Sequence, residues 1–234
     1  MANLAIIPAR GGSKRISKKN IKYFLGKPII SYSIEAAIKS NLFDEIMVST
    51  DDPEIAEIAR SYGAKTPFLR SSKNADDFAV LADVIEEVVQ NYTEKNSVFS
   101  NICCILPTAP FITSNKIIEA YEKLLENNFD SVFPVLEFSF PIQRSLKLEG
   151  NKTSMVWQEH LNSRSQDLEK RYHDSGQFYW VKAAVFSKEN KLFTKNSGAI
   201  VISELEAQDI DTETDWKLAE IKFKLMLDDQ EDNI

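Results

Sequence analysis

Short apolar runs alternate with helical patterns through the first 135 residues. The continuous apolar runs predict strands at residues 4–7, 45–50, 64–66, 102–106 and 130–135. Apolar residues at helical spacing predict helices between them, at residues 28–40, 53–63, 78–92 and 114–128. Alternation of this kind predicts an α/β fold, Rossmann-like, with a mostly parallel sheet and helices on both faces.

Residues with special backbone preferences mark the helix ends. Pro28 is predicted to be the first residue of its helix, because its missing N–H would be unpaired there in any case. Asp52 before Pro53 predicts a side-chain cap, and Thr113 or Ser114 caps a later helix.

The pattern changes after residue 136. Residues 137–166 read as extended segments with a turn near residues 149–151, so we expect an insertion and not another strand–helix unit. Strands at residues 177–182 and 199–202 then resume the sheet, and a helix follows from Thr212. We expect one domain, residues 1–234, with residues 137–166 as an inserted arm.

Composition and charge limit the class of protein. The chain has 234 residues and a net charge of −7, which argues against nucleic acid as a partner. Cys103 and Cys104 are adjacent in an apolar run, as expected for free thiols in a reducing compartment. No apolar run reaches the roughly 18 residues of a membrane helix, and the N-terminus has no signal-peptide pattern, so we expect a cytoplasmic protein without a membrane partner.

A cationic loop follows the first predicted strand of this acidic chain. It contains five cations within ten residues, namely Arg10, Lys14, Arg15, Lys18 and Lys19. Gly11 and Gly12 permit backbone conformations closed to other residues and let amide groups approach a ligand. Cations and exposed N–H groups after a strand predict a polyphosphate site, although neither the Walker A nor the G-x-G-x-x-G pattern is present. The alternative is a solvated basic loop.

The segment DIDTETD supplies acidic residues near the end of the chain. Asp209 and Asp211 lie two apart in an extended segment and can present both carboxylates to one point. Two carboxylates, completed by water and phosphate oxygens, suit Mg²⁺. The alternative is that Asp211 simply caps the helix, with Glu213 favouring its N-terminus.

The stretch IPARGGSKRISKKN closely resembles the N-terminal signature of the CMP-sialic acid synthetases, the acylneuraminate cytidylyltransferases. The resemblance continues through STDD, LPTAP and DIDTETD in the expected order. It implies a cytidylyltransferase that joins CTP to a nine-carbon 2-keto sugar acid, with Mg²⁺ as cofactor and pyrophosphate as the second product.

The resemblance also implies roles for single residues. Arg10 and Lys19 would stabilise the transition state, Asp209 and Asp211 would bind the metal, and Arg70 would contact the cytosine. The remaining residues implied in nucleotide binding are Gly11, Gly12, Ser13, Lys14, Asn20, Pro107 and Thr108.

Two features bear on the sugar. Leu106 is the first residue of LPTAP, and relatives active on N-acetylneuraminate commonly have Gln at this position. Leucine removes a hydrogen-bonding group, which fits a less hydroxylated sugar. The stretch YHDSGQFYW most resembles the pseudaminic acid branch of the family. Legionaminate, N-acetylneuraminate and Kdo remain alternative substrates, and a non-catalytic nucleotide-binding module remains an alternative of another class.

Residues 137–166 match the dimerisation arm of the family, which implies a homodimer. Arg164 matches the position that binds the sugar carboxylate and would act in its own or in the partner subunit's site. His173, Gln177 and Tyr179 are further sugar-side candidates. The alternatives are a hydrogen-bonded structural histidine and a core strand with one polar residue.

Overall fold

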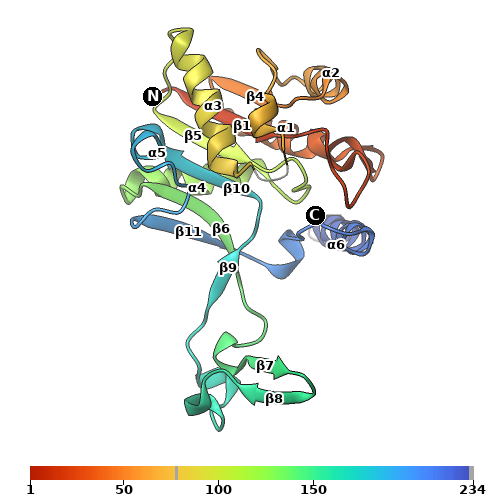
Figure 1. Ribbon diagram of the computed structural model, residues 1–234, viewed down its shortest axis with the longest axis vertical. Coiled ribbons are helices and arrows are strands. Elements are labelled where there is room, and N and C mark those ends of the chain that lie inside the picture. Colours follow the sequence, from red (N-terminus) through yellow and green to blue (C-terminus); the bar gives the residue numbers. More distant parts are fainter. Residues whose placement is uncertain (77–78, 232–234) are drawn as a thin grey trace.

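A single mixed sheet forms the centre of the molecule (Figure 1). The computed structural model describes residues 1–76 and 79–231. The strand order is β11-β6-β10-β5-β1-β4, and β9 pairs with β6. The strands are β1 (Asn3–Pro8), β4 (Glu45–Ser49), β5 (Asn101–Ile105), β6 (Ser131–Glu137), β9 (Tyr172–Asp174), β10 (Phe178–Lys182) and β11 (Ser197–Ile202).

Strand direction confirms the mostly parallel α/β prediction. β1 is parallel to both β4 and β5, and β11 is parallel to β6. β10 runs antiparallel between β5 and β6, and β9 is antiparallel to β6.

Helices cover both faces of the sheet. They are α1 (Ile29–Ser40), α2 (Pro53–Ser61), α3 (Leu81–Glu94), α4 (Ser114–Glu126), α5 (Ala183–Glu189) and α6 (Glu213–Glu231). Ala5 and Ile7 of β1 pack in one core with residues of α1, α2 and α4, whereas Leu4 and Ile6 pack in another with α3 and α5. Alternate residues of β1 therefore contact opposite helical layers, which explains why the strand is apolar throughout.

The predicted helix ends are confirmed at two caps and wrong at one proline. The Asp52 side chain accepts hydrogen bonds from the N–H groups of residues 54 and 55, and the Thr113 hydroxyl accepts one from Lys116. Pro28 instead ends strand β3 and caps α1, which begins at Ile29. Its backbone is extended, so it cannot be a helical residue.

Other differences concern short elements. Residues 64–66 contribute only a single bridge, between Lys65 and Met47. Helix α3 begins at Leu81, later than expected, and the predicted start at Phe78 lies outside the described residues. The sequence pattern did not indicate α5, β9 or the small hairpin of β2 (Tyr23–Phe24) and β3 (Lys27–Pro28). Short 3₁₀ helices occur at η1 (Lys19–Ile21), η2 (Ser72–Asn74), η3 (Ile142–Arg144), η4 (Gln158–His160), η5 (Ser165–Asp167) and η6 (Glu204–Glu206).

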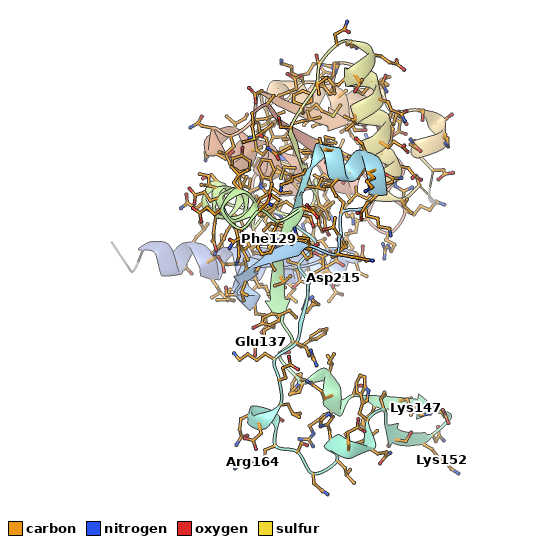
Figure 2. The ribbon with its side chains drawn as sticks, turned by 90° about the vertical axis from the view of Figure 1, so that its left-hand side faces the viewer. Phe129, Glu137, Lys147, Lys152, Arg164 and Asp215 are labelled. Atoms are coloured by element: carbon orange, nitrogen blue, oxygen red, sulfur yellow. The ribbon has the colours of Figure 1, made fainter. Side chains whose placement is uncertain are left out.

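Between β6 and β9 the chain leaves the sheet and forms a projecting arm, residues 138–171 (Figure 1). The arm carries a hairpin of β7 (Leu146–Glu149) and β8 (Lys152–Met155), and Gly150 takes a positive φ of 60° at the turn. Figure 2 shows Lys147, Lys152 and Arg164 in this arm, well away from the sheet. Most of the predicted insertion, residues 137–166, falls within it.

Within the part of the chain that the structure describes, no helix has the length and apolar character needed to cross a membrane.

Candidate functional site

The cationic loop lines a cavity of about 540 Å³ beyond the carboxyl ends of β1 and β5. This is where an open α/β sheet binds its ligands. We call it the cationic cavity. Predicted site residues in its wall are Arg10, Ser13, Lys14, Lys19, Asn20, Arg70, Leu106, Pro107 and Thr108. Residues more than 90 positions apart in the chain therefore meet in one cavity.

The loop is fixed by hydrogen bonds to its backbone. Asn20 is buried, and its side-chain amide donates to the Arg10 carbonyl at 2.9 Å. The Gly11 N–H donates to the Asp51 carboxylate at 3.0 Å. Lys18 takes a left-handed conformation with φ of 50° just before η1, which turns the chain so that Lys19 and Asn20 reach the cavity. Asn20 thus positions the loop as well as lining the cavity.

The two glycines differ from the prediction. Neither adopts a positive φ, so the expectation that both provide conformations closed to other residues is wrong. Gly11 is needed for close approach, because an added Cβ would lie 2.7 Å from Oδ2 and 3.0 Å from Cβ of Asp52. A Cβ on Gly12 would meet only open space.

Two of the three arginines that line the cavity are held by backbone and hydroxyl oxygens. Arg10 Nη1 donates to the Asp76 carbonyl at 2.9 Å. Arg70 is buried and donates from Nε to the Ser49 hydroxyl at 3.1 Å. Burial lowers the pKa of Arg70, and the charges of Asp51 and Glu87 oppose this effect. A buried, oriented guanidinium is suited to reading the polar edge of a planar ligand.

The acidic pair lies beside the cationic loop. Asp211 Oδ1 is 2.8 Å from Arg15 Nη2 and 3.5 Å from Lys19 Nζ, and Lys19 also donates to the Ile210 carbonyl at 2.7 Å. The pKa of Asp209 is raised, first by desolvation and then by the charge of Asp211, the other carboxylate of the pair.

The helix cap does not use these carboxylates. At the start of α6 the Thr212 hydroxyl accepts from the Asp215 N–H at 3.3 Å, and the Asp215 carboxylate accepts from the Thr212 N–H at 2.7 Å. This reciprocal pair caps the helix, so the alternative in which Asp211 serves only as the cap is wrong. Asp215, the third aspartate of DIDTETD, therefore has a structural role.

A second cavity of about 420 Å³ lies between β6, β9 and the chain leading to α6. Its wall includes Phe138, His173, Ser175, Asp209 and Lys222. Asp209 lines the second cavity, and Asp211 contacts Lys19 of the cationic cavity. The acidic pair therefore lies between the two cavities.

The residues predicted to contact the sugar lie in different parts of the structure. His173 lines the second cavity, with its ring 4.8 Å from that of Phe138. Gln177 and Tyr179 are buried, with side chains bonded to the Glu206 carbonyl and the Asp174 carboxylate, and neither belongs to the described wall of either cavity.

Arg164 lies in the projecting arm (Figure 2). Its side chain is 71% exposed and pairs at 2.7 Å with Asp167, so it is not brought to either cavity of its own chain as the structure describes them.

The acidic pair fits the requirements of Mg²⁺. Over residues 1–76 and 79–231, no cluster of three or more His, Cys, Asp or Glu side chains forms an all-protein metal cage. Mg²⁺ commonly takes one or two carboxylates and completes its octahedron with water and substrate phosphates. Asp209 and Asp211, beside a cavity lined by cations, offer this donor set.

Sequence reasoning missed three contributors to the two cavities. Arg15 was seen as part of the basic loop but not as the partner of Asp211. Asp51 lies in STDD, where its position after a strand could have marked it as a loop anchor. Ser175 lies in YHDSGQFYW, but its burial depends on tertiary packing and has no sequence signal.

Comparisons with known proteins agree with this geometry. The family described as Cytidylyltransferase matches residues 4–222. The chain is 44% identical over 226 residues to the pseudaminic acid cytidylyltransferase of Campylobacter jejuni, covering 96% of this chain and 97% of that protein. It is 32% identical over 231 residues to the CMP-N,N'-diacetyllegionaminic acid synthase of Legionella pneumophila, with coverage of 96% and 97%.

Among solved structures, the chain is similar to a CMP:2-keto-3-deoxy-manno-octonic acid synthetase complexed with CTP. The TM-score is 0.70 at 16% identity, covering 97% of this chain and 100% of that one, which supports the fold. The resemblance carried by the sequence motifs is confirmed: this chain belongs to the cytidylyltransferase family and is a CTP-dependent nucleotidyltransferase.

Proposed function

We propose that this enzyme transfers CMP from CTP to pseudaminic acid, a nine-carbon 2-keto sugar acid, and releases pyrophosphate. One observation carries the choice of sugar. At equal coverage of this chain, 96%, identity is 44% to the pseudaminic acid enzyme of Campylobacter jejuni and 32% to the legionaminic acid enzyme of Legionella pneumophila.

Leu106 supports the same choice. It lines the cationic cavity at the end of β5, where it offers an apolar surface and no hydrogen bond. An apolar group at this position favours a sugar with fewer hydroxyl groups.

The two cavities suit the two substrates. CTP would occupy the cationic cavity, with its triphosphate near Arg10, Lys14 and Lys19 and its cytosine toward Arg70. The sugar acid would occupy the second cavity, beside Asp209, and would extend to Leu106 at the edge of the cationic cavity. The anomeric hydroxyl then faces the α-phosphate across the acidic pair.

In the reaction, the anomeric oxygen forms a bond to the α-phosphorus. The bond from that phosphorus to the oxygen bridging to the β-phosphate breaks, its electron pair leaves with pyrophosphate, and the hydroxyl proton passes to water. Negative charge spreads over the phosphate oxygens in the transition state, so the fixed cations Arg10 and Lys19 stabilise it.

Asp209 and Asp211 would hold Mg²⁺ between the two cavities. When bound, the ion supplies Lewis-acid polarisation of phosphate oxygens. The Asp211 carboxylate also orients Arg15 and Lys19, because it contacts both cations.

The projecting arm supports a homodimer. A two-stranded hairpin is marginally stable alone in water, yet Leu146 and Leu148 are 61% and 70% exposed on one face of it. Phe140 nearby is 82% exposed. A second copy of the chain would cover these side chains, and Arg164 would then face the sugar cavity of the partner.

A cytoplasmic location belongs to the same proposal. It is supported by Cys103 and Cys104, which are free, adjacent in β5 and fully buried. Such thiols are common in reducing compartments.

Pyrophosphate release tests the proposed function. We expect release with CTP, Mg²⁺ and pseudaminate, lower kcat/KM with legionaminate and N-acetylneuraminate, and loss of release in Asp211→Asn. Preference for another sugar acid would refute the substrate assignment only. CTP binding without release in the presence of any sugar acid would favour the non-catalytic module.

A further inference from the structure

Ser175 lies in the wall of the second cavity with a side-chain hydroxyl that has no hydrogen-bond partner. The residue is 6% exposed, and its backbone N–H donates to the Pro134 carbonyl at 3.2 Å. Among the buried side-chain atoms that the structure describes, only Oε1 of Gln143, in the projecting arm, shares this lack of a partner.

Two charged side chains of the same cavity wall, Asp174 and Lys222, already have hydrogen-bond partners within the chain. The Asp174 carboxylate accepts from the Tyr179 hydroxyl at 2.5 Å and from the Gly176 N–H at 3.0 Å. The Lys222 ammonium donates to the carbonyls of Glu204 and Ala207 at 3.0 and 3.1 Å. The Asp174 and Lys222 side chains are therefore bonded within the chain, whereas the Ser175 hydroxyl has no such bond.

A buried hydroxyl without a partner costs free energy, and the great majority of such groups are bonded. Alanine would fill the same space at Ser175 without that cost. The hydroxyl therefore indicates a partner that arrives from outside the chain, and the cavity that Ser175 lines is the place where it would arrive.

We infer that the Ser175 hydroxyl hydrogen-bonds the sugar acid in the second cavity and contributes to its selection. The inference rests on the proposed function. The cavity wall is mixed, because Leu136 and Phe138 are apolar and Ser175 and His173 are polar. It suits a sugar that carries a polar acylamino or hydroxyl group beside a methyl group.

The test is Ser175→Ala, with each substrate varied at saturation of the other. We expect the KM for pseudaminate to rise about three- to tenfold, the size of one lost hydrogen bond. The KM for CTP stays unchanged. The melting temperature of the ligand-free variant equals or exceeds that of the wild type, because no bond within the protein is lost.

Ser40→Ala is a matched control. Ser40 is 5% exposed, but its hydroxyl donates to the Ala37 carbonyl at 2.7 Å and it lies in α1, in neither cavity wall as described. This variant should melt lower than the wild type, with both KM values unchanged. The contrast separates a hydroxyl that serves the fold from one that serves the substrate.

An unchanged KM for pseudaminate in Ser175→Ala would overturn the inference while leaving the proposed function intact. A lower melting temperature together with an equal proportional rise of both KM values would also overturn the inference, because the hydroxyl would then be a structural group. Wild-type enzyme that uses none of the sugar acids would refute the proposed function itself.

Discussion

Replacement of Gly11 by alanine tests how the cationic loop is built. The added Cβ would lie 2.7 Å from Oδ2 of Asp52 and 3.0 Å from its Cβ. Since the second contact involves the stem of the side chain, rotation of the carboxylate alone does not relieve it. Asp52 must move, and it caps α2 through a 2.8 Å hydrogen bond from Glu54 N–H.

The magnitude follows from the groups that are disturbed. Loss of an Asp cap costs about 1 kcal/mol. For a chain of this size that corresponds to a fall of about 2–4 °C in melting temperature. The hydrogen bond from Gly11 N–H to Asp51 is disturbed as well, so the loop shifts and the KM for CTP rises about fivefold.

Thermal unfolding and steady-state kinetics measure the two effects, with Gly12→Ala as the matched control. The neighbouring position has no atom within 4 Å of an added Cβ and no positive φ. We expect the melting temperature of Gly12→Ala and its KM for CTP to stay close to those of the wild type. If Gly11→Ala behaves like Gly12→Ala in both assays, the close approach to Asp52 does not shape the loop.

Three further predictions concern the metal, the sugar and the arm. Desolvation and a like charge raise the pKa of Asp209, so its charge destabilises the folded state at neutral pH. Without Mg²⁺, Asp209→Asn should therefore melt no lower than the wild type at pH 7. The difference between the two melting temperatures should disappear as the pH falls through that raised pKa, because the wild-type carboxylate is then neutral as well. A lower melting temperature of the variant at pH 7 would contradict this prediction. Leu106→Gln should shift the kcat/KM ratio about fivefold toward N-acetylneuraminate, and an unchanged ratio would show that this side chain does not select the sugar. Light scattering should give a dimer for the wild type and a monomer for the double variant Leu146→Ser and Leu148→Ser, while Lys147→Ser on the opposite hairpin face stays dimeric; a dimeric double variant rules out this face as the contact.

Local signals in the sequence predicted much of the fold. The cap at Asp52 and the turn before residue 152 are each decided by neighbouring residues, so they could be read directly from the chain. The apolar runs identified β1 and β5 because both strands are buried on two faces. The reversed direction of β10 had no such signal, because its antiparallel placement depends on partners more than 40 residues away.

The sequence predicted more residues of the cationic cavity than of the second cavity. The wall of the cationic cavity comes mainly from one loop and the ends of two strands, so a dense motif indicated it. The second cavity is assembled from two residues of β6, two of β9 and four of the chain before α6, which lie far apart in the sequence. Gln177 and Tyr179 have the residue types of a sugar site, but tertiary packing commits their polar atoms to Glu206 and Asp174.

The most direct test of the central claim is the product balance of one reaction. Wild-type enzyme is incubated with CTP, Mg²⁺ and pseudaminate, and CMP-sugar and pyrophosphate are quantified by mass spectrometry and a coupled assay. The account predicts equal amounts of both products and no pyrophosphate when the sugar acid is left out. Pyrophosphate formed with free CMP, or at the same rate without the sugar acid, would contradict transfer to the sugar.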